Sequence, residues 1–154
     1  MDLTVSVIGS GVAAPDTDVS AERVGALLAT AGAVVVCGGL GGVMAAVCRG
    51  ARTAGGRTIG VLPGADAAFA NPWVDVALPT GMGEARNLLV VRAGRAVIAI
   101  GGGFGTLSEL AFARTLQVPV VGLDTWHLPN DRVVHVDTPD EAVRVALSAA
   151  RQTR

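Results

Sequence analysis

The sequence contains no lysine, and its twelve basic residues are all arginine. A lysine forms the Schiff base of pyridoxal-phosphate enzymes and binds phosphate in a Walker A loop. Both kinds of site are excluded, and with them any pyridoxal-dependent lysine decarboxylase. Tyrosine is absent too, and the chain has only three Phe and two Trp. So few rings, together with a net charge of −1, argue against a nucleic-acid partner, which would need basic and stacking surfaces.

Cysteines and long hydrophobic runs are also scarce. The two cysteines, Cys37 and Cys48, have neither the spacing of a metal site nor that of a disulfide framework, so we expect no metal. The apolar runs are the length of strands, which is too short to span a membrane, and no signal peptide is recognisable. We therefore expect a cytoplasmic protein without a membrane partner. The length of 154 residues fits a single domain over residues 1–154.

Strand-like and helix-like patterns alternate along the chain. Apolar runs bounded by glycine or proline predict strands, and apolar residues at helical spacing predict helices. The expected strands are 3–8, 34–37, 58–62, 73–78, 96–100, 118–123 and 133–136, and the expected helices are 20–31, 43–54, 83–94, 104–116 and 139–150. Repeated βα units predict an α/β fold, a three-layer Rossmann-like doubly wound domain with a mainly parallel sheet.

A glycine-rich turn follows the apolar run 96–100 and precedes a helical pattern. Gly101, Gly102, Gly103 and Gly105 let the backbone approach a ligand closely, and Thr106 lies where the helix is expected to open. The unpaired N–H groups of a helix N-terminus attract anions, so this turn predicts a phosphate site. The stretch 106–109 also has the pattern of a capping box, in which Thr106 would serve only as a helix cap.

A second glycine motif, Gly9-Ser10-Gly11, resembles the start of a dinucleotide-binding fingerprint. Two features argue against NAD. The stretch 15–18 is expected to delay the following helix, and the second strand ends at Cys37-Gly38, where a ribose-binding acidic residue would be needed. Ser10 and Gly11 remain candidates for the lining of a different phosphate-binding pocket.

Three motifs in order resemble the LOG ("Lonely Guy") family, which has long been labelled lysine decarboxylase-like. Residues 102–109, Gly-Gly-Phe-Gly-Thr-Leu-Ser-Glu, resemble its P-G-G-x-G-T-x-x-E motif. Residues 38–44 resemble its other glycine loop, and the arginine of 83–87 lies where that family has one before a helix. The resemblance covers about residues 5–123. It implies a homodimer or larger homo-oligomer, with the apolar helix 83–94 as the candidate interface.

The resemblance also implies a function and a set of site residues. LOG enzymes are phosphoribohydrolases that cleave the N-glycosidic bond of nucleoside 5′-monophosphates without a required cofactor. By that resemblance Arg86 and Glu109 would be the catalytic pair. Glu109 would stabilise the oxocarbenium charge, and Arg86 would contact phosphate or hold Glu109 ionised. The expected ligand- and phosphate-binding residues are Ser10, Gly11, Gly39, Gly42, Gly101, Gly102, Gly103, Phe104, Gly105 and Thr106.

The chain departs from the LOG enzyme pattern in three places. Gly101 stands where those enzymes have proline, Asn87 stands where they have lysine, and the glycine loop 38–44 is shorter than theirs. These departures are similar to a related branch that includes molybdenum-cofactor carrier proteins, which bind a phosphorylated pterin without needing to hydrolyse it. The sequence therefore predicts a protein that binds a phosphorylated nucleotide-like molecule. It leaves two functions open: a phosphoribohydrolase, or a non-catalytic carrier of molybdenum cofactor or a related nucleotide.

Overall fold

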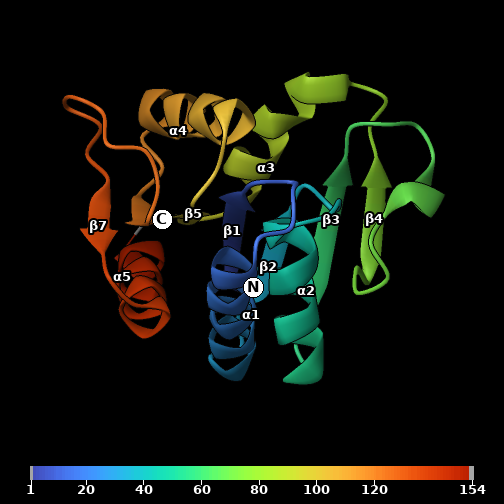
Figure 1. The fold of residues 1–154 in the computed structure, drawn as a ribbon, viewed down its shortest axis with the longest axis horizontal. Helices are drawn as coiled ribbons and strands as arrows, with labels where there is room; N and C mark the ends of the chain where they lie inside the picture. The colour runs from blue at the N-terminus through green and yellow to red at the C-terminus, as the bar shows by residue number, and fades with distance from the viewer. Residues whose placement is uncertain (1, 153–154) are drawn as a thin grey trace.

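A computed structural model describes residues 2–152 of the chain, and Figure 1 shows strands and helices alternating throughout. The strands are β1 (Thr4–Gly9), β2 (Val34–Cys37), β3 (Thr58–Leu62), β4 (Val76–Pro79), β5 (Val97–Ile100), β6 (Val120–Leu123) and β7 (Val134–Val136). The α-helices are α1 (Pro15–Thr30), α2 (Val43–Thr53), α3 (Asn87–Ala93), α4 (Phe104–Leu116) and α5 (Pro139–Gln152). Two 3₁₀ helices complete the described elements, η1 (Ala67–Phe69) and η2 (Gly83–Arg86).

The strands form one sheet in the order β4-β3-β2-β1-β5-β6-β7, and every neighbouring pair is parallel. Parallel sheets are covered by helices on both faces, so their strands are apolar on both sides. This explains the continuous runs at β2 and β5, in which every residue is buried. The predicted α/β, doubly wound parallel architecture is confirmed.

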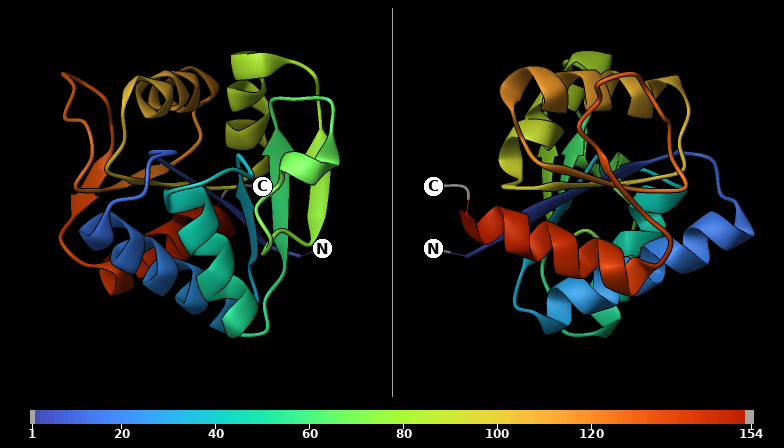
Figure 2. Two further views of the ribbon diagram at one scale, coloured as in Figure 1. Left: turned by 45° about the vertical axis from the view of Figure 1, so that its right-hand side comes forward. Right: turned by 90° about the vertical axis from the view of Figure 1, so that its left-hand side faces the viewer.

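The helices lie in two layers, one on each face of the sheet. Figure 2 shows α1, α2 and α5 together on one face and α3 and α4 on the other. Each layer has its own core. Val7 and Ile98 point toward the α1, α2 and α5 side, and Ile8 and Val97 point toward α3 and α4. The alternation of side chains along β1 and β5 therefore builds both cores at once.

The order of the strands creates a crevice beside β1. From β1 the chain passes through α1 to β2, and from β5 it passes through α4 to β6 on the other side. Because α1 and α4 cover opposite faces, the loops that follow β1 and β5 separate. Doubly wound proteins bind ligands at such a point, outside the carboxyl ends of the strands.

Several predicted boundaries are wrong by a few residues. Helix α1 begins at Pro15 and not at residue 20, because proline suits the first position of a helix and Asp16 and Asp18 complement the N-terminal dipole. The expected delay of this helix, one of the two arguments against NAD, is therefore absent. The predicted helix 83–94 is divided into η2 and α3, and β4 begins three residues later than expected.

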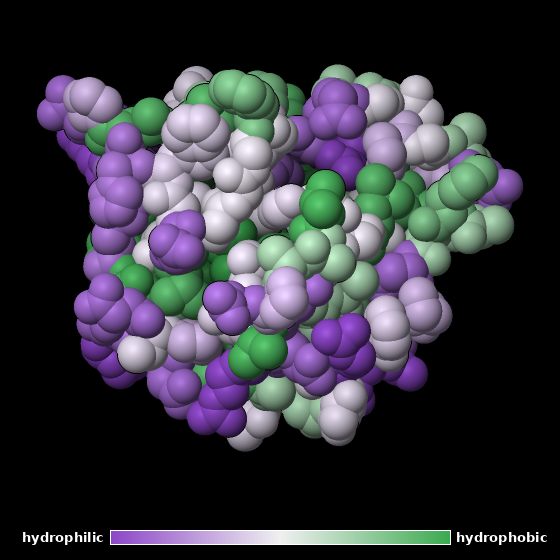
Figure 3. All heavy atoms as spheres, viewed as in Figure 1, coloured by the Kyte–Doolittle hydropathy of each residue, from purple (hydrophilic) through white to green (hydrophobic). Residues whose placement is uncertain are grey.

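The apolar helix that was the candidate subunit interface is covered largely within the chain. Val90 and Val91 of α3 are buried in the core beneath α4, whereas Leu89 is exposed. This run therefore does not by itself require a second subunit. Figure 3 shows apolar side chains in small groups between polar ones on the face it presents. No helix within residues 2–152 has the length and apolar character that crossing a bilayer requires.

Helices α1 and α2 touch backbone to backbone where glycine leaves room. A Cβ atom on Gly25 would lie 2.0 Å from the carbonyl oxygen of Val47, and one on Gly50 would lie 1.9 Å from that of Glu22. We expect Gly25→Ala to lower the free energy of unfolding by roughly 3 kcal/mol, the upper end of typical overpacking costs. Urea unfolding measures this loss.

Gly64→Ala is the matched control, since a Cβ there meets nothing within 4 Å. Its stability should equal or slightly exceed that of the wild type, because alanine restricts the unfolded chain. Equal unfolding midpoints for the two variants would contradict the close contact of α1 and α2.

Candidate functional site

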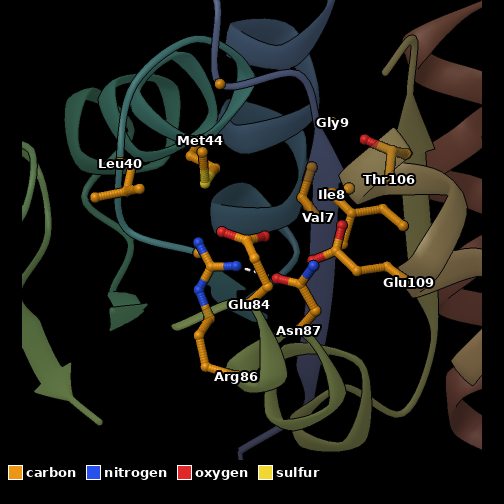
Figure 4. Close-up of a pocket in the computed structure, with 13 residues that line it drawn as sticks. Val7, Ile8, Gly9, Leu40, Met44, Glu84, Arg86, Asn87, Thr106 and Glu109 are labelled. Atoms are coloured by element: carbon orange, nitrogen blue, oxygen red, sulfur yellow. Dashed lines mark hydrogen bonds between the residues drawn. The ribbon is translucent and has the colours of Figure 1, made fainter. Parts of the chain in front are cut away.

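A cleft of about 240 Å³ opens at the carboxyl ends of β1 and β2, at the crevice defined by the strand order. Figure 4 shows Arg86 and Asn87 reaching it from one side, Leu40 and Met44 from α2 and its preceding loop, and Thr106 and Glu109 from α4. The lining residues are Val7, Ile8, Gly9, Gly11, Gly38, Leu40, Met44, Glu84, Arg86, Asn87, Gly105, Thr106 and Glu109. Four distant segments of the sequence thus meet in one site.

Arg86 is the buried cation of this cleft, with 6% of its surface exposed. Its Nε donates a hydrogen bond of 2.9 Å to the carbonyl oxygen of Val61, and its Nη1 donates to Oδ1 of Asn87. Both acceptors are neutral. Within residues 2–152 no carboxylate oxygen lies within 4.0 Å of its guanidinium nitrogens. A buried charge normally requires a partner, so this guanidinium is a candidate binding site for an anion.

Gly38 and Met44 hold the guanidinium closely on its other side. A Cβ atom on Gly38 would lie 2.9 Å from Nη2 of Arg86 and 2.6 Å from the sulfur of Met44. Any larger residue at position 38 would displace one of them. The sequence alone does not mark Gly38 or Met44 as site residues, because a glycine after a strand and a methionine on an apolar helix are both common without a ligand.

The N-terminus of α4 forms the opposite wall. Gly103 is its N-cap, and the backbone before it passes through positive φ at Gly101 (54°) and Gly102 (109°). The predicted capping box is wrong, because Thr106 lies inside the first turn and no side chain caps the helix. Thr106 instead packs its side chain over Gly102, where a Cβ would lie 2.3 Å from the hydroxyl oxygen. The first-turn N–H groups of α4, which lack partners inside the helix, thus adjoin the cleft.

Glu109 lies on the same helix with 7% of its surface exposed. Burial raises its pKa to about 8 from an ordinary value of 4.5, although the charge of Arg86 opposes this rise. The expectation that Arg86 holds Glu109 ionised is therefore wrong, because desolvation of the carboxylate outweighs the attraction across the cleft. At neutral pH the side chain is mainly an uncharged acid, able to donate a hydrogen bond.

The structure divides the residues predicted for the ligand site into two groups. Gly11, Gly105, Thr106, Arg86 and Glu109 line the cleft together. The others lie outside its lining and shape the loops around it: Ser10, Gly39, Gly42, Gly101, Gly102, Gly103 and Phe104. At Gly42, for example, a Cβ atom would lie 2.2 Å from the carbonyl oxygen of Ser10. The absence of a side chain there lets α2 approach the loop that follows β1.

The two histidines lie away from this cleft. The rings of His127 and His135 stack with centroids 3.7 Å apart, and Nε2 of His135 is 3.5 Å from a carboxylate oxygen of Asp131. Among the described residues no group of three or more His, Cys, Asp or Glu side chains could hold a metal ion. Trp126, on the same loop, donates its indole N–H to the carbonyl oxygen of Gly103.

Comparison with known proteins places the chain in a family. The sequence model of the SLOG cluster4 family matches residues 2–152, and the protein belongs to that family. This confirms the predicted LOG-like assignment. An uncharacterized protein of Archaeoglobus fulgidus is 38% identical over 155 residues, covering 96% of this chain and 97% of its own.

Solved structures of the same fold include two proteins described by the cofactor that they bind. The molybdenum cofactor binding protein of the phototrophic bacterium Rippkaea orientalis is 34% identical with a TM-score of 0.90, over 96% of this chain and 97% of its own. The molybdenum cofactor carrier protein of Chlamydomonas reinhardtii is 31% identical with a TM-score of 0.90, over 98% of this chain and 99% of its own.

The raised pKa of Glu109 makes stability depend on pH. Between about pH 4.5 and pH 8 the folded protein keeps a proton that the unfolded chain loses, so the free energy of unfolding falls as pH rises. Glu109→Gln removes this fall in the free energy of unfolding, because glutamine does not ionise. We expect the variant to match the wild type near pH 4 and to be more stable above pH 8, by up to about 5 kcal/mol.

Urea unfolding of both proteins across this pH range measures the difference. The Gln side chain has the shape of the protonated acid, so the comparison isolates the ionisation. A difference that does not grow with pH would show that Glu109 titrates normally.

Proposed function

We propose that this protein binds a phosphorylated small molecule in the Arg86 cleft and serves as a carrier of molybdenum cofactor. The observation that carries the proposal is the buried guanidinium of Arg86, which has only neutral partners among the described residues. A phosphate group would supply the missing negative charge, since arginine pairs with phosphate through charge-assisted hydrogen bonds. The two solved relatives described as molybdenum cofactor proteins support the choice of ligand.

The cleft suits the phosphate end of such a ligand. Gly105 and Thr106 present the first turn of α4, which favours anions, opposite the Arg86 side chain. Protonated Glu109 adds no negative charge to repel the phosphate and can donate a hydrogen bond to it. The volume of about 240 Å³ is slightly below the range of typical small-molecule pockets, so the pterin would extend toward the cleft mouth.

The ionisation of Glu109 favours a carrier over a hydrolase. Cleavage of an N-glycosidic bond develops positive charge on the sugar, which a fixed carboxylate stabilises. A side chain with a pKa of about 8 is mostly uncharged at neutral pH and supplies little of that stabilisation. The phosphoribohydrolase remains the second candidate, since Arg86 and Glu109 do line one cleft. Self-association into a homodimer or larger assembly also stays a prediction.

Binding of the cofactor tests the first function. Purified protein is incubated with molybdenum cofactor released from a molybdoenzyme and passed over a sizing column, and molybdenum and pterin are measured in the protein fraction. We expect molybdenum and pterin to co-elute with the wild-type protein. Arg86→Gln should weaken cofactor binding at least about tenfold, because it removes a charge-assisted hydrogen bond to the phosphate.

Arg92→Gln is the matched control, because Arg92 is an exposed arginine on α3, the helix that follows Arg86. It should bind like the wild type. Absence of cofactor from the wild-type fraction would overturn the carrier function, and full binding by Arg86→Gln would place the ligand elsewhere.

Incubation with a panel of nucleoside 5′-monophosphates tests the second candidate. We expect no release of free base or ribose 5-phosphate on chromatography, because Glu109 is uncharged near pH 7. Base release that disappears in Glu109→Gln would establish the hydrolase in place of the carrier. An unrelated contaminating nucleosidase is recognised by activity that survives in that variant.

A further inference from the structure

Asn87 is buried beside Arg86, with 3% of its surface exposed, and its amide is bonded at both ends. Its Oδ1 accepts from Nη1 of Arg86, and its Nδ2 donates a hydrogen bond of 3.1 Å to Oγ of Ser108. The hydroxyl of Ser108 in turn donates to the carbonyl oxygen of Gly105 at 2.6 Å. A continuous chain of hydrogen bonds thus joins the guanidinium to the first turn of α4.

The direction of this chain is unambiguous. Arginine can only donate, so the atom of Asn87 that faces it must be the oxygen, and the nitrogen must face Ser108. An amide side chain can accept at one end and donate at the other in this way. Lysine could not accept from Arg86, and aspartate could not donate to Ser108.

The neutrality of the amide matters as much as its geometry. An aspartate at position 87 would fit the same space but would form a buried ion pair with Arg86, and the positive charge of the cleft would be cancelled from within. Asn87 holds the guanidinium without neutralising it. The carboxyl side chains that line the same cleft, Glu84 and Glu109, make no ion pair with Arg86 within the described residues.

We propose that Asn87 is the positioning and specificity-determining residue of this site: it orients Arg86 toward the cleft, leaves its charge free for a phosphate group and fixes it relative to α4. This inference rests on the proposed phosphate binding at Arg86 and names the residue that makes the arginine selective for an anion. Ser108 is the second member of the same positioning chain.

The test uses inorganic phosphate as the probe, titrated into the full chain at constant ionic strength, with chloride as the reference anion. Affinity is read from the quenching or enhancement of tryptophan fluorescence and checked by ³¹P NMR line broadening. We expect Asn87→Asp to weaken phosphate binding at least about tenfold, since it cancels one charge-assisted contact. Its melting temperature should be retained, because the new ion pair replaces the hydrogen bond.

Weaker phosphate binding with an unchanged melting temperature would identify Asn87 as a positioning residue. If Asn87 were merely structural, the substitution would lower the melting temperature and leave the phosphate affinity of the folded protein unchanged. Ser108→Ala should weaken phosphate binding by a smaller factor of about threefold, as for one neutral hydrogen bond. Ser148→Ala, an exposed serine of α5 on the other face of the sheet, is its control and should bind as the wild type does.

A double-mutant cycle with Arg86→Gln completes the test. If Asn87 acts through Arg86, Asn87→Ala weakens binding in the wild-type background and has no further effect beside Arg86→Gln. Phosphate binding by the wild type together with unchanged binding by Asn87→Asp would overturn this inference and leave the proposed function standing. Absence of phosphate binding by the wild type would instead overturn the proposed function, and the inference with it.

Discussion

The guanidinium of Arg86 is a full positive charge held inside the protein by neutral groups, and the architecture of the site depends on it. Burial of an ion without an opposite charge is costly, and hydrogen bonds to the Val61 carbonyl and the Asn87 amide offset only part of that cost. A buried positive charge without an opposite charge therefore lies at the carboxyl edge of the sheet. The ligand that we propose, a phosphorylated molecule, would supply the opposite charge.

Glycine makes the space in which this charge can lie. A Cβ on Gly9 would lie 2.6 Å from the carbonyl oxygen of Ile100, and one on Gly38 would press on Arg86 itself. These residues let β1, β5 and the arginine approach one another more closely than side chains would allow. Gly9 and Gly38 thus serve the close packing around the cleft.

Two buried side chains of the cleft differ in the charge that they contribute. Arg86 supplies a guanidinium, whereas burial raises the pKa of the Glu109 carboxyl to about 8. At neutral pH no buried carboxylate therefore opposes Arg86, and Glu84, the other acid of the lining, is exposed. A buried guanidinium with a proton donor beside it agrees with the retention of a phosphorylated molecule that we propose, and it offers little stabilisation to a cationic sugar.

Much of this protein could be predicted from its sequence because the relevant signals are local. Apolar runs that end in glycine turns predicted the parallel doubly wound sheet, and the turn after β5 pointed to α4. The resemblance to the LOG family, carried by short motifs, drew attention to Arg86 and Glu109. Helix starts were less certain, as Pro15 shows, since a proline can either precede a helix or begin it.

Only the tertiary structure decided which residues share the cleft and in what state. Gly38, Met44 and Asn87 lie in motifs that the sequence already marked, but their contacts with Arg86 exist only because distant segments converge there. The protonation of Glu109 was predicted wrongly for the same reason. Periodicity and turn chemistry are properties of neighbouring residues, whereas desolvation and charge pairing depend on groups that only folding brings within a few ångströms.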